Sequence, residues 1–486
     1  MRKLFVVFGS LAYSTVAMGQ MGRSLDWPSF ANDNQRTGWE KLDPRFTKDT
    51  VAKDFQFLWK MKPSGGGQHT LMPPVLIGTL IGYRGFKELA FIGDTNGALH
   101  VMDSDLNRLY WDKKFDYMAD VPKAAATATC TGGMAAPTLL SIGFRRPGPP
   151  RPAAATVPGA PPPRPTPNLM FGPRAIYVIT SDGRLRKVNA ADGSDVSAPV
   201  AVLPANAKIS ALNMNDQVIY ATTNADCGGA ANAVWAVDIG SSDKPAVKSF
   251  ESKGGNFGGM GGPVIGNDGT IYAQGGAGDS LLALTARDLQ LKGTFQVPGG
   301  LKSDVTPVVF AYKNRDVIVT AGKDGRLYIA DSAAMGGEPL GMSDVVGGSV
   351  WGGLTSWAEP DGTRWVLASS WGPVGDTKNG AVVAFKLEEQ GGKAMLTKTW
   401  TSQDLIKPVP SVTTNGVVFA LSSGDAATRT KAVVYALDAT TGKELWSSKN
   451  QMTAAGNLTG MTIANGRLYV GTVDSTMWVF GVPMEW

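Results

Sequence analysis

The sequence predicts an all-β protein, an eight-bladed β-propeller made of four-stranded antiparallel blades. Segments rich in Val, Ile and Tyr alternate with Gly, Asn and Asp turns along the 486 residues, and long amphipathic helical patterns do not occur. A chain of this length is too long for an ordinary single core unless it is built from repeats. A recurring β-hairpin unit meets that condition, because four-stranded sheets repeated around an axis form a propeller.

The clearest copy of the unit is "VVYALDATTGKELWSSK", residues 433–449. Its first five residues are apolar and predict a strand with two covered faces. Asp438 can accept backbone N–H groups in the turn that follows, and Gly442 tolerates the positive φ of a tight turn. Trp446 then anchors the returning strand. Because a unit of about sixteen residues cannot bury its own apolar surface, it must stack on neighbouring units.

Eight copies of the unit occur, the last of them incomplete. They occupy residues 89–111, 175–196, 218–247, 270–291, 316–340, 365–400, 417–446 and 467–481. Most copies are preceded by a short apolar strand that begins after a small residue and Pro, as in "GGPVIG". We expect this strand to be the inner strand of each blade. The last copy lacks an outer strand, and "FQFLWK", residues 55–60 with Trp59, is predicted to supply it. Pairing both chain ends in one blade closes the ring.

The first residues have the pattern of a secretory signal, with an Arg-Lys pair, a short apolar run and then small residues. We therefore expect a signal peptide over residues 1–19, an N-terminal extension over 20–54 and the propeller over 55–486. The mature protein is then exported, either periplasmic or secreted, with no transmembrane segment. A retained membrane anchor is the alternative, although the apolar run is short for a membrane span.

A proline-rich segment, residues 145–168, interrupts blade two between its inner and second strands. Proline at this density excludes a helix or a sheet ladder and leaves an extended, polyproline-like or disordered chain. Two interpretations are open: a solvated loop insertion, or a segment that docks a partner.

Glycine-rich stretches such as "GGNFGGMGGP" and "GGSVWGG" gather on one predicted face of the ring. The loops between blades and those between second and third strands all lie on that face. Glycine lets the backbone approach the axis closely. This could make room for a flat ligand, or it could merely allow close packing around a narrow channel. The candidates for ligand binding on this face are Trp351, Lys302, Asp304 and Asn457. Trp351 could instead fill the channel, and Lys302 could simply pair with Asp304.

Cys130 and Cys227 are the only cysteines in the chain. Cys130 precedes the inner strand of blade two and Cys227 lies in the hairpin of blade three, so both fall on the glycine-rich face of adjacent blades. An even pair of cysteines in an exported protein is compatible with a disulfide. We predict a Cys130–Cys227 disulfide that clamps these loops.

Two stretches resemble a known superfamily. "ALDATTGKELW", residues 436–446, and "DWPSFANDNQRTGW", residues 26–39, are similar to the pyrroloquinoline-quinone-like β-propellers. Two branches of that superfamily matter: the quinoprotein alcohol dehydrogenases, and the propeller lipoprotein of the outer-membrane β-barrel assembly machinery. The resemblance covers nearly all of the predicted mature chain. It implies the fold without selecting an activity, because the matching residues are blade-packing residues.

Membership of the dehydrogenase branch implies bound pyrroloquinoline quinone, a Ca²⁺ site from Glu, Asn and Asp, and a carboxylate base. In many of its members, a disulfide between adjacent cysteines packs on the quinone, which Cys130 and Cys227 cannot provide. The sequence also lacks the C-x-x-C-H motif of covalent haem. The assembly branch resembles this chain in size and in lacking catalytic residues. Its lipid-anchor cysteine is absent here.

The remaining residue types add little chemistry. His69 and His100 are the only histidines, and no spacing typical of a metal site occurs. We expect His100 to pack in its hairpin and His69 to be solvated. A formal net charge of +5 does not indicate a nucleic-acid partner.

These observations favour a non-catalytic, monomeric module that binds an envelope protein or a small ligand, with no assigned catalytic or metal-binding residue. The alternative is a pyrroloquinoline-quinone-dependent alcohol or sugar dehydrogenase.

Overall fold

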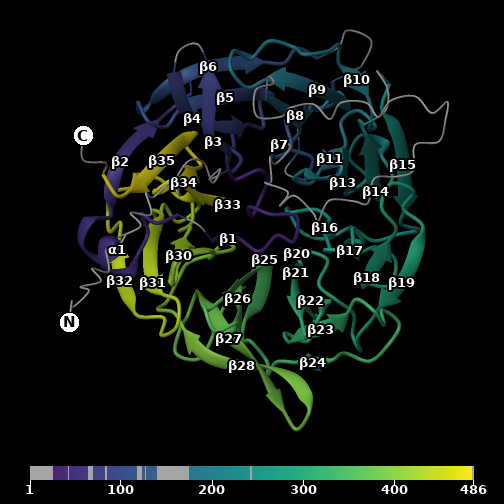
Figure 1. Ribbon diagram of the computed structural model, residues 1–486, viewed down its shortest axis with the longest axis vertical. Helices are drawn as coiled ribbons and strands as arrows, with labels where there is room; N and C mark the ends of the chain where they lie inside the picture. The colour runs from purple at the N-terminus through teal and green to yellow at the C-terminus, as the bar shows by residue number, and fades with distance from the viewer. Residues whose placement is uncertain are drawn as a thin grey trace, which may run out of the picture.

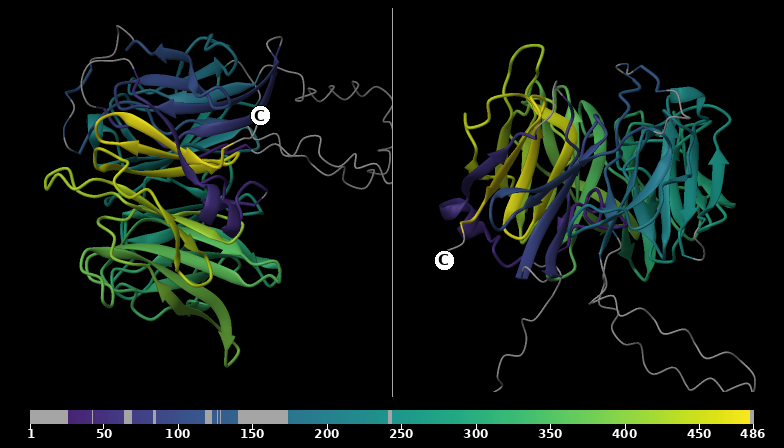
Figure 2. Two further views of the ribbon diagram at one scale, coloured as in Figure 1. Left: turned by 90° about the vertical axis from the view of Figure 1, so that its left-hand side faces the viewer. Right: turned by 90° about the horizontal axis from the view of Figure 1, so that it is seen from above.

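The computed structural model describes residues 26–41, 43–63, 69–82, 85–117, 123–125, 127, 129–139, 174–240 and 244–483. Within these ranges the chain forms eight small, mainly antiparallel sheets around one axis, with one short α-helix (Figure 1). The side views show the strands running between the two faces of the ring (Figure 2). The predicted eight-bladed β-propeller is confirmed.

Blades 1 to 4 follow one another along the chain. Blade 1 contains β3 (Val75–Gly82), β4 (Gly85–Gly93), β5 (Ala98–Asp103) and β6 (Arg108–Lys114). Blade 2 contains β7 (Thr138–Leu139), β8 (Ala175–Ile179), β9 (Arg184–Asn189) and β10 (Val200–Ala201). Blade 3 contains β11 (Lys208–Ile209), β12 (Asn213–Asn215), β13 (Val218–Asn224), β14 (Ala233–Asp238) and β15 (Ala246–Glu251), with a 3₁₀ turn, η1 (Cys227–Gly229). Blade 4 contains β16 (Val264–Ile265), β17 (Ile271–Gly275), β18 (Ser280–Leu284) and β19 (Leu291–Phe295).

Blades 5 to 8 complete the ring. Blade 5 contains β21 (Val308–Tyr312), β22 (Arg315–Ala321), β23 (Leu327–Asp331) and β24 (Gly341–Met342). Blade 6 contains β25 (Ser349–Ala358), β26 (Arg364–Trp371), β27 (Gly380–Gln390) and β28 (Lys393–Thr401), with β20 (Val305–Thr306) parallel to β25. Blade 7 contains β29 (Val412–Thr414), β30 (Val417–Ser422), β31 (Val433–Asp438) and β32 (Glu444–Ser447), with β1 (Trp39–Glu40) parallel to β29. Blade 8 contains β33 (Gly456–Ala464), β34 (Arg467–Thr472), β35 (Thr476–Gly481) and β2 (Gln56–Met61).

A strand from the N-terminal part of the chain joins the C-terminal strands in blade 8. Strand β2 pairs antiparallel with β35, and Trp59 lies opposite Val479 (Figure 1). The sequence predicted this closure by the N-terminal strand. The helix α1 (Lys48–Asp54) precedes β2, begins with a capping box of Thr47 and Thr50, and contacts β32.

The apolar core is divided among the junctions between blades, so that buried clusters join each blade to the next. Outer-strand tryptophans dock on the turn of the following blade: Trp111 on Gly193 and Trp400 on Gly442. Gly442 has φ +70°, and a Cβ added there would lie 2.6 Å from the Trp400 ring. Glycine is therefore required both by the turn and by the close packing.

Some predictions concern residues outside the described ranges. These include the signal peptide over residues 1–19 and the proline-rich segment over 145–168, which follows β7 and precedes β8 in the chain. Among the helices of the described residues, none has the length and apolar composition needed to cross a membrane.

Candidate functional site

The N-terminal strap, residues 26–41, crosses the centre of the ring (Figure 1). Its main chain follows the inner strands in the order of the blades. The backbone N–H groups that donate to strap carbonyls belong to Leu76, Leu139, Ile265, Val309, Ser356 and Thr413. These donors lie in blades 1, 2, 4, 5, 6 and 7. The strap thus satisfies inner-strand groups that would otherwise face the axis unpaired.

The side chains of Phe30 and Arg36 fill the axis itself. The Arg36 guanidinium donates to the carbonyl oxygens of Leu212 and Gly261 (each 3.0 Å) and of Phe30 (2.6 Å). Burial lowers the pKa of Arg36 to about 9, and the negative charge of Asp33 acts in the opposite direction. The cavity that Phe30 and Arg36 line has a volume of about 20 Å³. A typical small-molecule site has roughly 300–1,000 Å³.

Three of the four ligand-binding candidates lie at the junction of blades 5 and 6. Lys302 Nζ donates to Ser349 Oγ (2.8 Å) and lies 3.4 Å from Asp304 Oδ1. Trp351, two residues beyond Ser349 on β25, stacks on Trp371 with ring centroids 4.4 Å apart and an interplanar angle of 18°. The Lys302–Asp304 pair was one of the two alternatives, and it forms. One face of Trp351 is already covered.

Asn457 lies apart from the other three candidates. It belongs to β33 of blade 8, its side chain is buried, and its amide nitrogen donates to the carbonyl oxygen of Leu71 at 3.3 Å. This contact joins blade 8 to the loop that leads into blade 1. The four candidates therefore do not form a single constellation.

The predicted disulfide between Cys130 and Cys227 is confirmed, with Cα atoms 5.6 Å apart. It joins the loop before β7 to η1, in the β13–β14 hairpin. Because these loops belong to adjacent blades on one face, the bond restrains that face of the ring.

The expectation for His69 was wrong, because this side chain is buried. The chain around it is held between two hairpins. Ser475 Oγ accepts from the His69 amide and donates to its carbonyl, each at 2.9 Å, and Leu71 forms a β-bridge with Asp94. His100 is buried in its hairpin, as predicted. Together these contacts bring His69, Asp94 and His100 into one cluster, although separations of 25 and 6 residues match no familiar metal motif.

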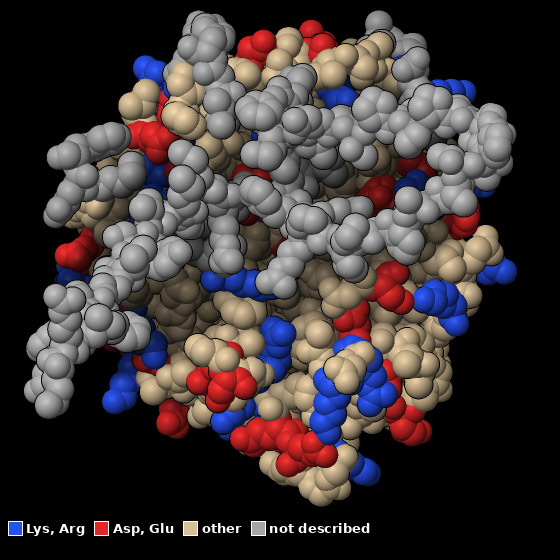
Figure 3. Space-filling view, viewed as in Figure 1, with Lys and Arg blue, Asp and Glu red and all other residues tan. Residues whose placement is uncertain are grey.

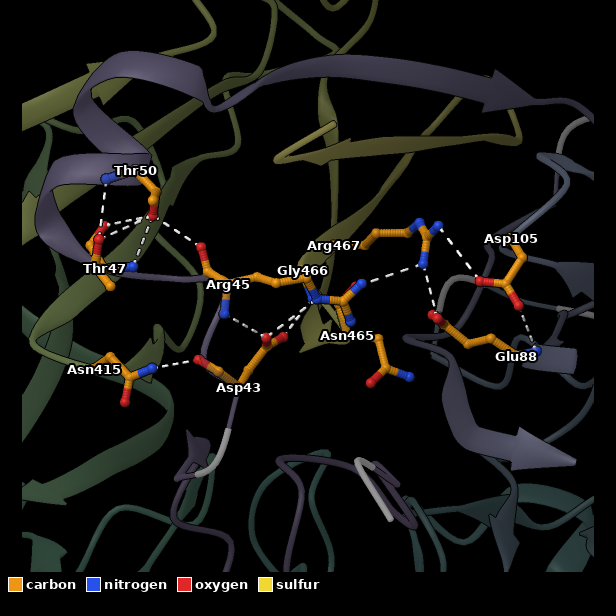
Figure 4. A network of polar contacts seen from close by, with 10 residues as sticks. All are labelled: Asp43, Arg45, Thr47, Thr50, Glu88, Asp105, Asn415, Asn465, Gly466 and Arg467. Atoms are coloured by element: carbon orange, nitrogen blue, oxygen red, sulfur yellow. Dashed lines mark hydrogen bonds and ion pairs between the residues drawn. The ribbon is translucent and has the colours of Figure 1, made fainter. Parts of the chain in front are cut away.

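A second buried polar cluster lies near the opposite end of β4 (Figure 4). Arg467 Nη1 of blade 8 donates to Glu88 Oε2 of blade 1 at 2.8 Å, and Arg467 also lies 3.8 Å from Asp105. Burial raises the pKa of Glu88 to about 7, because lost hydration outweighs the attraction of Arg467. Asp43 extends the network by accepting from the Gly466 amide. The network fastens the junction of blades 8 and 1 on the face opposite the glycine-rich loops, which we call the strap side.

Charged side chains of both signs are interspersed over blades 5 to 7 on the face shown in Figure 3. The described part of that face has no continuous basic area of the kind that binds a nucleic-acid backbone.

These features define a closed β-propeller whose axis is filled by its own N-terminal strap. Comparisons with known proteins refine that class. Residues 378–482 match the family model described as outer membrane protein assembly factor BamB. The match covers the last part of the ring, from the β26–β27 hairpin to the end of blade 8. Among curated proteins, none matches the chain.

Solved structures with the same fold come from both predicted branches. The quinohemoprotein alcohol dehydrogenase from Comamonas testosteroni has a TM-score of 0.60 and 14% identity, over 95% of this chain and 81% of that chain. A europium-containing methanol dehydrogenase has a TM-score of 0.57 and 10% identity, over 94% and 98%. BamB from Moraxella catarrhalis has a TM-score of 0.50 and 14% identity, over 89% and 99%.

The predicted resemblance to the pyrroloquinoline-quinone-like β-propellers is thereby confirmed. Identities this low establish a shared fold and leave the activity open.

Proposed function

We propose that this chain is a non-catalytic binding or scaffold module of the cell envelope. In this proposal the protein is exported and presents the glycine-rich face of a rigid, monomeric ring to a protein or small ligand. The Cys130–Cys227 disulfide supports export, because such bonds persist in oxidising compartments.

The filled axis carries the proposal. Phe30 and Arg36 occupy the space where a ligand of the ring centre would sit, and they leave about 20 Å³. The candidates Lys302, Asp304 and Trp351 satisfy one another or their neighbours, which stiffens the loops around them. A stiff face loses little conformational entropy on association, as a scaffold requires.

A pyrroloquinoline-quinone-dependent alcohol or sugar dehydrogenase is the second candidate, because two of the structurally similar proteins are dehydrogenases. The described residues do not fit the quinone well. Trp351 already stacks on Trp371, and the axial cavity is far smaller than a fused three-ring molecule. The one described group of at least three His, Cys, Asp or Glu side chains spaced to hold a metal contains two histidines, whereas Ca²⁺ prefers oxygen ligands.

Quinone binding separates the two candidates. Purified protein is incubated with pyrroloquinoline quinone and Ca²⁺, passed through gel filtration, and assayed for quinone absorbance and alcohol-dependent dye reduction. We expect neither retention nor turnover. Retention of the quinone together with turnover would establish the dehydrogenase instead.

Site-specific photo-crosslinking in intact cells tests the binding face. Ala427 is an exposed residue of the β30–β31 hairpin on the glycine-rich face, and Asp361 is an exposed turn residue on the strap side. A photoreactive residue at Ala427 should give a discrete crosslinked product, and the matched replacement of Asp361 should not. The same product from both positions would contradict a face-specific interaction. Unchanged crosslinking after deletion of residues 145–168 would remove the proline-rich segment from that interaction.

A further inference from the structure

Three side chains with metal-binding atoms converge on the glycine-rich side of blade 1. His69 lies in the loop before β3, Asp94 follows β4, and His100 lies on β5. Their side chains are only 6%, 1% and 3% exposed, respectively. One ligand atom from each residue lies within 4.8 Å of the other two. Buried polar groups normally have hydrogen-bond partners, so the way these atoms are satisfied needs an explanation.

The contact between His69 and Asp94 is short but is not a hydrogen bond. His69 Nε2 lies 3.3 Å from Asp94 Oδ2, yet neither ring nitrogen of His69 has a hydrogen-bond partner. His100 Nε2 lies 3.2 Å from the same oxygen. His69 Nε2 and Asp94 Oδ2 are therefore close together without the geometry of a hydrogen bond. This arrangement fits two ligand atoms that are both directed at one metal ion. Bonds of about 2.0–2.1 Å to a tetrahedral zinc ion place neighbouring ligand atoms about 3.3–3.4 Å apart.

We infer that His69, Asp94 and His100 bind a divalent transition-metal ion, for which Zn²⁺ is the best match. Two imidazoles and one carboxylate suit zinc and its neighbours, whereas Ca²⁺ and Mg²⁺ prefer oxygen ligands. The three residues leave a coordination position for water or for an external ligand.

The corresponding hairpins of other blades show the usual contact between the aspartate of the turn and a side chain on the strand that follows. In blade 2, Arg186 pairs with Asp182 at 2.9 Å, and in blade 5 the Tyr328 hydroxyl donates to Asp324 at 2.7 Å. Each of these contacts lies within a single hairpin. His100 with Asp94 repeats that arrangement. His69 does not, because it arrives from the preceding loop and adds a second imidazole.

The surrounding structure holds the ligands in place. Asp94 Oδ1 accepts the amides of Asn96 (3.0 Å) and Ala98 (2.7 Å), which leaves Oδ2 directed at the histidines. Asn96 lies in the turn between β4 and β5, and Ala98 is the first residue of β5, so this hairpin fixes the orientation of the Asp94 carboxylate.

Bound metal would fasten the ring where it closes. His69 belongs to the connection between β2 of blade 8 and β3 of blade 1, and Asp94 and His100 belong to blade 1 itself. The site therefore joins the closing connection to the first complete hairpin, on the face opposite the Glu88–Arg467 pair.

The chain is well suited to a direct test, because its only two histidines are in the site and both cysteines are in the disulfide. Full-length protein without an affinity tag is titrated with Zn²⁺ by calorimetry and with Co²⁺ by visible absorption at neutral pH. We expect one ion per chain, with no comparable binding of Mg²⁺ or Ca²⁺. His69→Ala removes a ligand that makes no side-chain hydrogen bond, so the fold should persist. Its zinc affinity should fall by more than the roughly 10–100-fold that loss of an outer-shell partner costs.

His100→Tyr is the matched control for the hairpin, because it introduces the residue found at the corresponding place in blade 5. It should keep the fold and lose the metal. Imidazole ¹⁵N spectra of the wild type give a readout that needs no variant: zinc should shift a ring nitrogen of both His69 and His100. Unchanged histidine signals, or equal zinc affinity in His69→Ala and wild type, would overturn the inference.

Discussion

Two buried polar clusters lie at the junction of blades 8 and 1, near opposite ends of β4: Glu88 lies in the first half of this strand, and Asp94 directly follows its last residue. On the strap side, Glu88 and Arg467 form an ion pair at 2.8 Å. On the glycine-rich side, His69 and Asp94 come within 3.3 Å without a hydrogen bond. Both clusters contain buried atoms without a partner, among them Glu88 Oε1 and Arg467 Nε in the first and both ring nitrogens of His69 in the second. The first cluster nevertheless contains a complete ion pair between two blades, whereas the His69 side chain in the second has no hydrogen-bond partner at all. This difference suggests that the junction of blades 8 and 1 is stabilised in two ways. One is an ion pair formed within the chain, and the other is a site that can bind an external cation.

The largest expected effect comes from breaking the ion pair. Arg467→Met leaves the Glu88 carboxyl buried without its cation and should destabilise the protein by about 3–5 kcal/mol at pH 8. The denaturant midpoint measures this loss. The matched control is the double variant Glu88→Leu with Arg467→Met, which should recover most of it because apolar groups can replace a buried pair. Similar losses in both variants would show that packing of the arginine side chain, and not its charge, fastens this end.

The pH dependence of stability tests the same pair without removing the cation. The pKa of Glu88 is raised to about 7 in the folded protein from a reference value of 4.5, so the folded state binds more protons between these values. The stability that this proton binding by Glu88 contributes to the folded state is fully present below about pH 4.5 and is lost as the pH rises through 7. Relative to Glu88→Gln, the wild type should lose about 3 kcal/mol of unfolding free energy over this range. A constant difference between the two proteins would contradict the raised pKa.

Zinc should act on the other cluster. Free Zn²⁺ at a hundred times its dissociation constant should stabilise the wild type by about 2.7 kcal/mol. Thermal unfolding with and without zinc measures this gain, and His69→Ala should show none of it. Equal stabilisation of Arg467→Met and wild type would show that the two clusters act independently. A gain of the same size in His69→Ala would place the binding elsewhere.

An ion pair outside the junction provides the smallest effect. Lys48 Nζ lies 2.8 Å from Asp438 Oδ2, and the lysine side chain is 42% exposed. Solvent screening limits such pairs, so Lys48→Met should cost only about 0.5 kcal/mol. Denaturant unfolding beside Arg467→Met compares an exposed pair with a buried one. A loss as large as that of Arg467→Met would remove burial as the reason for the difference.

Much of the ring could be predicted because its signals are local. Asp438, Gly442 and Trp446 follow one another in a single hairpin, and the same pattern recurs in the other units. The missing outer strand of the last unit made Trp59 and its neighbours the natural partner of β35. Even the Cys130–Cys227 disulfide follows from counting strands, because strand order decides which face each loop occupies.

The candidate site was less predictable. The Lys302–Asp304 pair was foreseen because the two residues are neighbours in sequence. Asn457 proved to be buried against Leu71, because the turn of the chain into blade 1 covers it. The expectation that His69 is solvated was wrong for a similar reason. A glycine-rich stretch indicates an exposed loop, and only the tertiary structure shows the blade against which it packs.

The sequence by itself predicted the repeat, the number of blades, the closure and the disulfide. Hairpin patterning is local, and once the strands are counted, their order places each loop on one face and leaves the last blade one strand short. Only the tertiary structure decided that the strap fills the axis and that His69, Asp94 and His100 meet. Both depend on where a closed ring places segments from different blades. The strap sequence has no periodicity that predicts its path, because main-chain hydrogen bonds to one blade after another set that path. The spacing of His69, Asp94 and His100 does not predict their cluster, because these residues meet only when the ring closes.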